Sequence, residues 1–143
     1  MAMICDTGAV YALYDADDVH HAGCTSQIET ERGPLLLPVA LLSEIDYLLT
    51  SRLGVAASLD FFESVEAGSF DLVPLQQADL SRCRELMREY QDLSLGFADA
   101  SVVVVAEQLK LQRIFTVDHR HFRAIRPRGL DHFVILPADR PAN

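Results

Sequence analysis

Four acidic side chains, far apart in the chain, are candidates to act together in one site: Asp6, Glu44, Asp99 and Asp118. Carboxylates placed close together repel one another, so such a cluster is usually accompanied by protons or by a divalent cation. Oxygen ligands without a histidine or cysteine partner suit Mg²⁺ or Mn²⁺ better than zinc. The chemistry best served by such a site is phosphodiester hydrolysis, in which the cation activates water and stabilises charge on the attacked phosphate.

Two of these acids are expected where strands end. The apolar run Met3–Cys5 leads to Asp6, and the β-branched run 113–117 leads to Asp118. Both runs alternate with helical segments, which is typical of a parallel sheet. Because ligands of open parallel sheets bind beyond the carboxyl ends of the strands, distant acids could converge at that edge. Taken alone, Asp6 is also an ordinary helix N-cap.

Asp99 is expected in the first turn of a helix. Either Ser94 or Gly96 could cap this helix, which continues to about Leu109. The run Val102–Val105 favours a strand by itself, and a buried strand is the alternative there. Good helix formers flank the run, and a helix covered by other elements can be apolar around most of its circumference. We therefore predict a buried helix, in which Asp99 is either a site residue or a simple capping acid.

Glu44 is expected on a helix that begins at Pro38 and ends at Gly54. Leu41 lies three residues before Glu44 and Leu48 lies four residues after it, so the Glu44 carboxylate is predicted near the buried face of the helix. A buried acid needs a hydrogen-bonding partner or a cation. The alternative to a site residue is thus a partly buried structural acid.

The other segments complete one α/β domain over residues 1–137. Helices are expected at residues 9–14, 19–32, 55–67 and 76–90, and further strands at 35–37, 69–75 and 132–137. The segment 69–75 contains a proline, which places it at the edge of the sheet. Residues 138–143 are expected to form a flexible C-terminal tail.

The composition indicates a protein that needs no disulfides. Half of the 143 residues are hydrophobic, enough for a sizeable core. The three cysteines are odd in number and widely spaced, which favours reduced thiols over a disulfide framework or a zinc site. The N-terminus lacks a basic region followed by a long apolar run, and no apolar stretch approaches the length of a membrane span. We expect a cytoplasmic protein with no membrane partner.

The charge distribution is uneven along the chain. A net charge of -9 argues against broad non-specific nucleic-acid binding. However, six of the twelve basic residues lie between Lys110 and Arg128, where the only acid is Asp118. This basic segment is either a solvated surface or a phosphate-binding patch. Its candidate RNA-binding residues are Arg120, Arg123 and Arg126.

The acids and their surroundings resemble the PIN-domain ribonucleases, and most closely the VapC toxins of bacterial toxin-antitoxin pairs. The segments that carry the resemblance are Ile4-Cys-Asp-Thr-Gly-Ala, Ser43-Glu44, Phe97-Ala-Asp-Ala and Phe115-Thr-Val-Asp-His-Arg-His-Phe. By this resemblance Asp6, Glu44, Asp99 and Asp118 match the acidic quartet that holds Mg²⁺, and Thr116 matches its companion hydroxyl. Gly8 departs from the pattern, because many members have a serine there.

The resemblance also implies a fold, an activity and partners. The fold would be a PIN-like three-layer α/β/α sandwich with a central, mostly parallel sheet, assembled as a homodimer. The activity would be that of an endoribonuclease dependent on Mg²⁺ or Mn²⁺, which cleaves structured cellular RNA (tRNA or rRNA) and thereby inhibits translation. The partners would be the RNA and a VapB-like antitoxin, whose basic or aromatic tail blocks the acidic pocket.

Two other functional classes are compatible with clustered acids. A receiver-like signalling domain also gathers acids at strand ends around Mg²⁺, but it requires paired acids after the first strand and a lysine on a late strand, and neither is present. A catalytically silent acidic interaction domain could keep the same cluster for partner binding. Metal-dependent RNA cleavage separates the nuclease from both alternatives.

Overall fold

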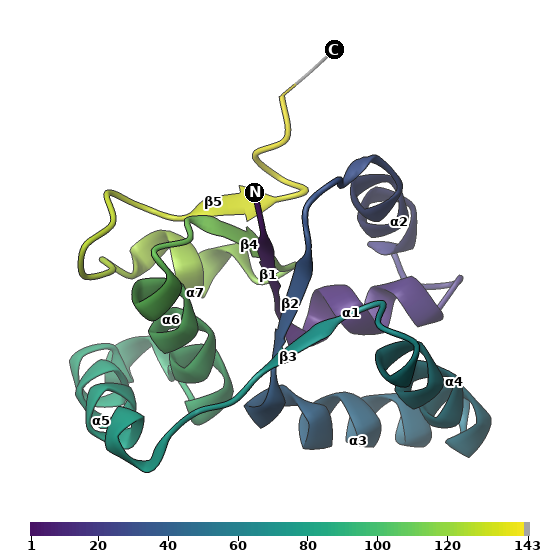
Figure 1. Cartoon of the computed structure of the whole chain (residues 1–143), viewed down its shortest axis with the longest axis horizontal. Coiled ribbons are helices and arrows are strands. Elements are labelled where there is room, and N and C mark those ends of the chain that lie inside the picture. Colours follow the sequence, from purple (N-terminus) through teal and green to yellow (C-terminus); the bar gives the residue numbers. More distant parts are fainter. Residues whose placement is uncertain (142–143) are drawn as a thin grey trace.

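A five-stranded sheet forms the centre of the computed structural model, which describes residues 1–141 (Figure 1). The strands are β1 (Met3–Cys5), β2 (Leu35–Pro38), β3 (Asp71–Val73), β4 (Arg113–Phe115) and β5 (Val134–Leu136). Their order is β3-β2-β1-β4-β5, and every neighbouring pair is parallel. The predicted parallel sheet is confirmed, and the proline-containing segment 69–75 supplies its edge strand β3.

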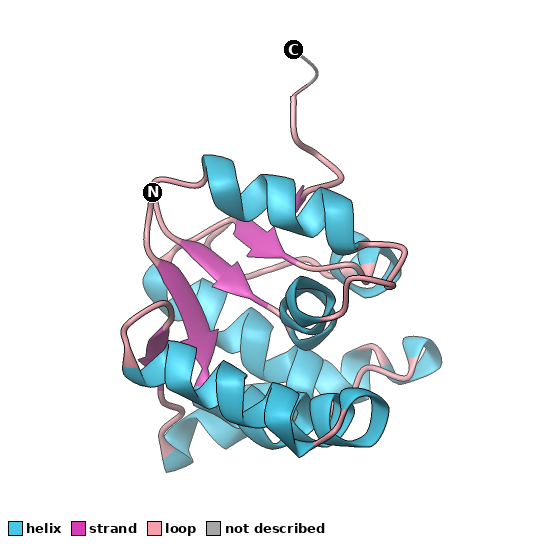
Figure 2. Ribbon diagram, turned by 90° about the vertical axis from the view of Figure 1, so that its right-hand side faces the viewer, coloured by secondary structure: helices cyan, strands magenta, loops and turns pink. Residues whose placement is uncertain are grey.

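Helices cover both faces of the sheet, which confirms the predicted three-layer α/β/α sandwich (Figures 1 and 2). On one side lie α1 (Thr7–Tyr14), α2 (His21–Thr30), α3 (Leu42–Leu53) and α4 (Val55–Glu66). On the other side lie α5 (Leu80–Glu89), α6 (Phe97–Leu109) and the short α7 (His119–Ala124). Three single 3-10 turns precede α3, α5 and α6: η1 (Val39–Leu41), η2 (Gln77–Asp79) and η3 (Gln91–Leu93).

Helix α6 contains the β-branched run Val102–Val105, so the strand alternative for this run is wrong. Each of the seven side chains from Ala100 to Ala106 is buried, because α6 packs between the sheet and α5. Burying a valine side chain is worth about 1.5–3 kcal/mol. Helix propensity disfavours valine by less than about 0.7 kcal/mol per residue. Burial therefore outweighs local preference and fixes a rigid helix whose first turn carries Asp99.

The core contains the whole of β1, with Met3, Ile4 and Cys5 fully buried at the centre of the sheet. All three cysteines are buried free thiols, as the sequence predicted. Within residues 1–141, none of the helices combines the length and the apolar character needed to cross a bilayer.

The end of the chain contacts the domain. Within the segment predicted to be a tail, the Arg140 guanidinium donates to Ser26 Oγ at 2.8 Å, and Asp139 accepts from the backbone N–H of Ile135 at 2.8 Å. Residues 142–143 of that predicted tail lie outside the described part of the chain.

A largely buried ion pair ties α5 to α6. Arg82 on α5 donates to both carboxylate oxygens of Glu107 on α6, at 2.9 and 2.8 Å, and Glu107 also accepts from the backbone N–H of Arg128 at 2.7 Å. Burial raises the pKa of Glu107, but these bonds outweigh burial and hold the pKa below its usual range. The carboxylate thus joins three segments on one side of the sheet.

Replacing Glu107 with glutamine should lower the free energy of unfolding by about 2 kcal/mol, because the amide turns a donor toward Arg82 and removes the compensating charge. Chemical denaturation measures this loss. Glu85→Gln is the matched control, since Glu85 contacts Arg82 and Arg128 from a position that is 45% exposed. It should cost less than about 1 kcal/mol. Equal losses in the two variants would refute a special role for Glu107.

Candidate active site

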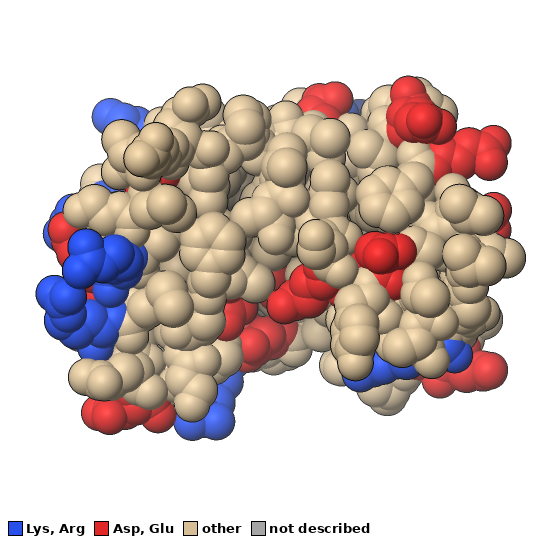
Figure 3. All heavy atoms as spheres, turned by 90° about the horizontal axis from the view of Figure 1, so that it is seen from below, with Lys and Arg blue, Asp and Glu red and all other residues tan. Residues whose placement is uncertain are grey.

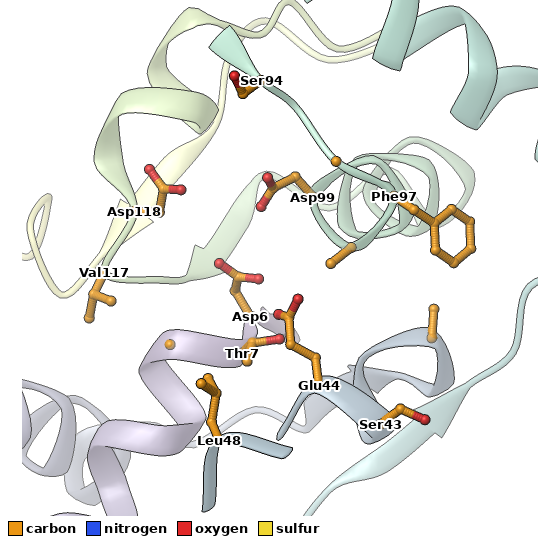
Figure 4. A pocket seen from close by; sticks show the side chains of 14 residues that line it. Asp6, Thr7, Ser43, Glu44, Leu48, Ser94, Phe97, Asp99, Val117 and Asp118 are labelled. Atoms are coloured by element: carbon orange, nitrogen blue, oxygen red, sulfur yellow. The ribbon is translucent and has the colours of Figure 1, made fainter. Parts of the chain in front are cut away.

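The carboxyl edge of the sheet opens into a pocket of about 630 Å³, and all four predicted acids line it (Figure 4). Asp6 follows β1, Glu44 comes from the first turn of α3, Asp99 from the first turn of α6, and Asp118 directly precedes α7. Viewed from this edge, acidic side chains gather along a hollow in the middle of the face, while basic side chains lie toward its margins (Figure 3). The structure therefore brings the four acids together.

Asp6 is the buried acid of the group. Its Oδ2 atom accepts a hydrogen bond from the Thr116 hydroxyl at 2.8 Å, and the same hydroxyl accepts from the backbone N–H of Asp118 at 3.0 Å. Thr116 follows β4, the neighbour of β1, so adjacent strands place the threonine between two acids. Burial raises the pKa of Asp6 to about 7; the Thr116 bond opposes this shift, and the charges of Asp99 and Glu44 add to it.

Asp99 lies in the first turn of α6, where its negative charge also suits the helix dipole. The N-cap of this helix is Gly96, and Ser94 ends the preceding η3 turn in a left-handed conformation. Burial raises the pKa of Asp99, and the charges of Asp118 and Glu44 raise it further against the opposing effect of His121. Asp99 thus needs a positive charge in the pocket.

Glu44 is exposed, so its predicted position near the buried face is wrong. The buried stripe of this segment consists of Leu41, Ile45 and Leu49, which follow one another at four-residue intervals. Glu44 lies on the flank of that stripe, where its carboxylate points into the pocket (Figure 4). Packing of η1 and α3 decides this orientation, which periodicity alone left open.

His121 completes the cluster and was not singled out from the sequence. Its Nδ1 atom lies 2.9 Å from Asp118 Oδ2 and 3.1 Å from Asp99 Oδ2. His121 therefore adds a nitrogen donor to a cluster for which the sequence indicated oxygen ligands. The available signal was the spacing of three residues between Asp118 and His121, which meet on one side of a helix. Helix α7 has only six residues, too few for a periodic pattern to reveal it.

Gly8 stands at a position where a side chain would meet a steric obstacle. A Cβ atom at Gly8 would come within 2.8 Å of Val117 Cγ2, closer than side-chain carbons normally approach. A serine at this position would require Val117 to move. Gly8 and Val117 both line the pocket, so glycine here permits a close approach between the start of α1 and the segment after β4.

The donor set fits a divalent cation. The ligand atoms of Asp99, Asp118 and His121 all lie within 4.8 Å of one another. Asp6 and Glu44 add carboxylates from the opposite wall of the same pocket (Figure 4). Burial raises the pKa of Asp6 and Asp99, and repulsion among the carboxylates raises it further; a cation would neutralise the cluster and remove that repulsion.

The three candidate RNA-binding arginines differ in whether they already form an ion pair within the protein. Of the three candidate RNA-binding residues, Arg123 donates to Asp139 at 3.2 Å through Nη1 and forms an ion pair with it. Arg120 and Arg126 are exposed, and neither forms an ion pair within residues 1–141. These two guanidinium groups are available to a ligand.

Comparisons with known proteins agree with the fold. The family model of the PIN domain matches residues 3–126. The chain is 34% identical over 135 residues to ribonuclease VapC26 of Mycobacterium tuberculosis, and the match covers 94% of this chain and 100% of that protein.

Solved structures with the same fold share less sequence. VapC20 of M. tuberculosis, described as a toxin that cleaves the sarcin-ricin loop, superimposes with a TM-score of 0.78 at 17% identity, over 83% of this chain and 92% of that chain. A toxin-antitoxin complex of Klebsiella pneumoniae gives 0.67 at 15% identity, over 86% and 92%. VapBC2 of Rickettsia felis, bound to a DNA fragment from its promoter, gives 0.65 at 11% identity, over 94% and 97%.

Asp6→Asn should stabilise the metal-free protein at pH 8. Because the folded pKa of about 7 exceeds the ordinary value of 3.8, the folded protein keeps a proton that the unfolded chain releases between these values. The free energy of unfolding therefore falls as pH rises from about 4 to 7, and the loss is complete above 7. Asparagine keeps an acceptor for Thr116 and avoids this loss.

Chemical denaturation with a chelator at pH 5 and pH 8 tests this expectation. The gain of Asp6→Asn over the wild type should be larger at pH 8. Asp71→Asn, at an exposed position on the edge strand, controls for the general loss of one negative charge. The same small change in both variants at pH 8 would show that Asp6 carries no electrostatic cost.

Proposed function

The chain belongs to the PIN domain family, and from that premise we propose that it is a divalent-metal-dependent endoribonuclease, the toxin of a toxin-antitoxin pair. The convergence of four carboxylates on one pocket carries this proposal. The relative that is 34% identical along its whole length is a ribonuclease, which supports the same activity. A receiver-like domain or a silent interaction domain is not favoured by these matches.

We assign the metal ligands to Asp6, Glu44, Asp99 and Asp118, and the cation to Mg²⁺ or Mn²⁺. When bound, the cation would activate water and stabilise negative charge on the phosphate. Thr116 is a positioning residue, because its one hydroxyl bonds the Asp6 carboxylate and the Asp118 backbone. These bonds keep the two acids in a fixed relation before substrate arrives.

Glu44 has a different role from the buried acids. It is exposed, and no hydrogen bond to its carboxylate is present within residues 1–141. A carboxylate free to turn within the pocket is suited to take the proton of the attacking water. We therefore assign Glu44 two roles: one carboxylate oxygen would be a ligand of the cation, and the other would take the proton of the water as general base.

Structured cellular RNA, either tRNA or rRNA, is the substrate class that we propose. The described activity of VapC20 on the sarcin-ricin loop supports this class. Because the chain carries a net charge of -9, phosphate contacts must come from a local basic surface. Arg120 and Arg126, exposed and unpaired among residues 1–141, supply such contacts close to Asp118. Cleavage of tRNA or rRNA would inhibit translation in the cytoplasm.

A VapB-like antitoxin is the proposed protein partner, and a homodimer is the proposed assembly. The K. pneumoniae and R. felis structures, both toxin-antitoxin complexes, support the partner. An apolar groove of about 390 Å³ adjoins the acidic pocket and shares Ala40 and Phe97 with it. A tail with an aromatic residue in the groove and a basic residue in the pocket would block the site.

Asp99→Asn should reduce metal-dependent cleavage by on the order of a hundredfold or more while melting changes little. Asparagine keeps the shape and the helix position but loses the charge that holds the cation. The assay follows cleavage of total cellular RNA with added Mg²⁺ or Mn²⁺, beside thermal melts. Asp92→Asn, an exposed aspartate outside the pocket, should cleave like the wild type. Undiminished cleavage by Asp99→Asn would reduce Asp99 to a helix-dipole residue.

Replacing both Arg120 and Arg126 with alanine should weaken RNA binding and lower the salt slope of log K by roughly 1.4–1.8, since each lost phosphate contact contributes about 0.7–0.9. Binding is measured at several salt concentrations in the Asp99→Asn background, which leaves the RNA intact. Arg123→Ala is the matched control, because its guanidinium is already paired with Asp139. If the salt slope were the same for the Asp99→Asn parent, the double arginine variant and the Arg123→Ala control, Arg120 and Arg126 would belong to a solvated surface that does not bind RNA.

A further inference from the structure

We propose that His121 is a ligand of the divalent cation through its Nδ1 atom, and that it makes the site prefer a transition metal such as Mn²⁺ over Mg²⁺. The inference rests on the proposed function, since it concerns the cation of the same pocket. It goes beyond an all-carboxylate site by adding one nitrogen donor. His121 lies on α7 and is 17% exposed.

The tautomer of His121 is fixed by a backbone contact. Its Nε2 atom lies 2.7 Å from the carbonyl oxygen of Leu93, the last residue of η3. A carbonyl oxygen only accepts hydrogen bonds, so Nε2 carries the hydrogen and donates it. In the neutral ring, the lone pair must then be on Nδ1. A histidine that donates one ring N–H to a backbone carbonyl and turns the other nitrogen inward has the usual arrangement of a metal ligand.

The inward nitrogen faces two carboxylates at ion-pairing distance. Nδ1 is buried and has no hydrogen-bond partner within residues 1–141, although Asp118 Oδ2 and Asp99 Oδ2 are only 2.9 and 3.1 Å away. If the ring were protonated and hydrogen-bonded to one of these acids, the Nδ1–H bond would point at that carboxylate oxygen. A lone pair directed at two anions is unfavourable, so either a proton on Nδ1 or a cation among the three atoms must offset the two negative charges.

The two separations from Nδ1 are compatible with ligands that would share one octahedral cation. Neighbouring ligands at about 2.1 Å from such a cation stand about 3 Å apart. The separations of 2.9 and 3.1 Å from Nδ1 to the two carboxylate oxygens match this spacing. Two helices supply the ligands, since Asp99 is on α6, Asp118 caps α7 and His121 is within α7.

A nitrogen donor changes which cation the site prefers. Mg²⁺ is hard, dehydrates reluctantly and is held mainly by oxygen atoms. Imidazole nitrogen binds first-row transition metals more strongly, with Mn²⁺ at the weak end of that series. The acidic quartet alone accepts either Mg²⁺ or Mn²⁺, whereas His121 adds affinity for Mn²⁺ selectively.

Pulsed electron paramagnetic resonance of the full chain loaded with Mn²⁺ tests the ligand directly. The electron spin echo of the wild-type complex should carry modulation from a coordinated ¹⁴N nucleus. His121→Asn should abolish this modulation, and His119→Asn should retain it. His119 is the matched control, because it lies on the same short helix, is exposed and is outside the ligand cluster.

Calorimetric titration with Mn²⁺ and with Mg²⁺ supplies the second readout. His121→Asn should weaken Mn²⁺ binding about tenfold or more and Mg²⁺ binding distinctly less, whereas His119→Asn should change neither. Mn²⁺ bound to the wild type without nitrogen modulation would overturn the role of His121, even if the variant failed to fold. Equal effects of His121→Asn on both cations would overturn the selectivity. Failure of the wild type to bind either cation would instead refute the proposed metal-dependent function itself.

Discussion

Mutual repulsion among carboxylates in one pocket is the constraint on which this structure depends. Asp6 is buried and its pKa rises to about 7, so the fold holds an acid where burial and its neighbours oppose its charge. It is held there by the pairing of β1 with β4 and by the single Thr116 hydroxyl between Asp6 and the Asp118 backbone. The surrounding core therefore offsets an electrostatic cost that a bound cation would relieve.

The rigidity of the site follows from how its supporting elements are packed. Helix α6 is buried along most of its length and presents Asp99 in its first turn, so the position of that carboxylate is set by core packing. The ion pair of Arg82 with Glu107 fixes the far end of the same helix to α5. Of the four acids, Glu44 is the exposed one, and no hydrogen bond to its carboxylate is present within residues 1–141.

His121 and Gly8 make this pocket more than a set of four acids. The imidazole of His121 is oriented by the Leu93 carbonyl and faces Asp99 and Asp118. The six-residue helix α7 therefore supplies the nitrogen donor of the site and affects its charge. Gly8 allows Val117, the residue before Asp118, to approach closely. Both features adjoin Asp118, where the metal pocket meets the exposed basic surface that we propose for RNA.

Local patterns in the sequence were sufficient to predict the parallel α/β sandwich and its edge strand. They also placed Asp6 and Asp118 at strand ends and Asp99 at the start of a helix. These patterns suffice because periodicity, helix breakers and capping residues act over a few neighbouring residues. Tertiary packing decided the rest. It turned Glu44 out of the core and paired Arg123 while leaving Arg120 exposed, and burial explains why the helix predicted over Val102–Val105 prevails over a strand. It also brought His121 to the acids, since a contact between a loop carbonyl and a short helix leaves no periodic trace in the sequence.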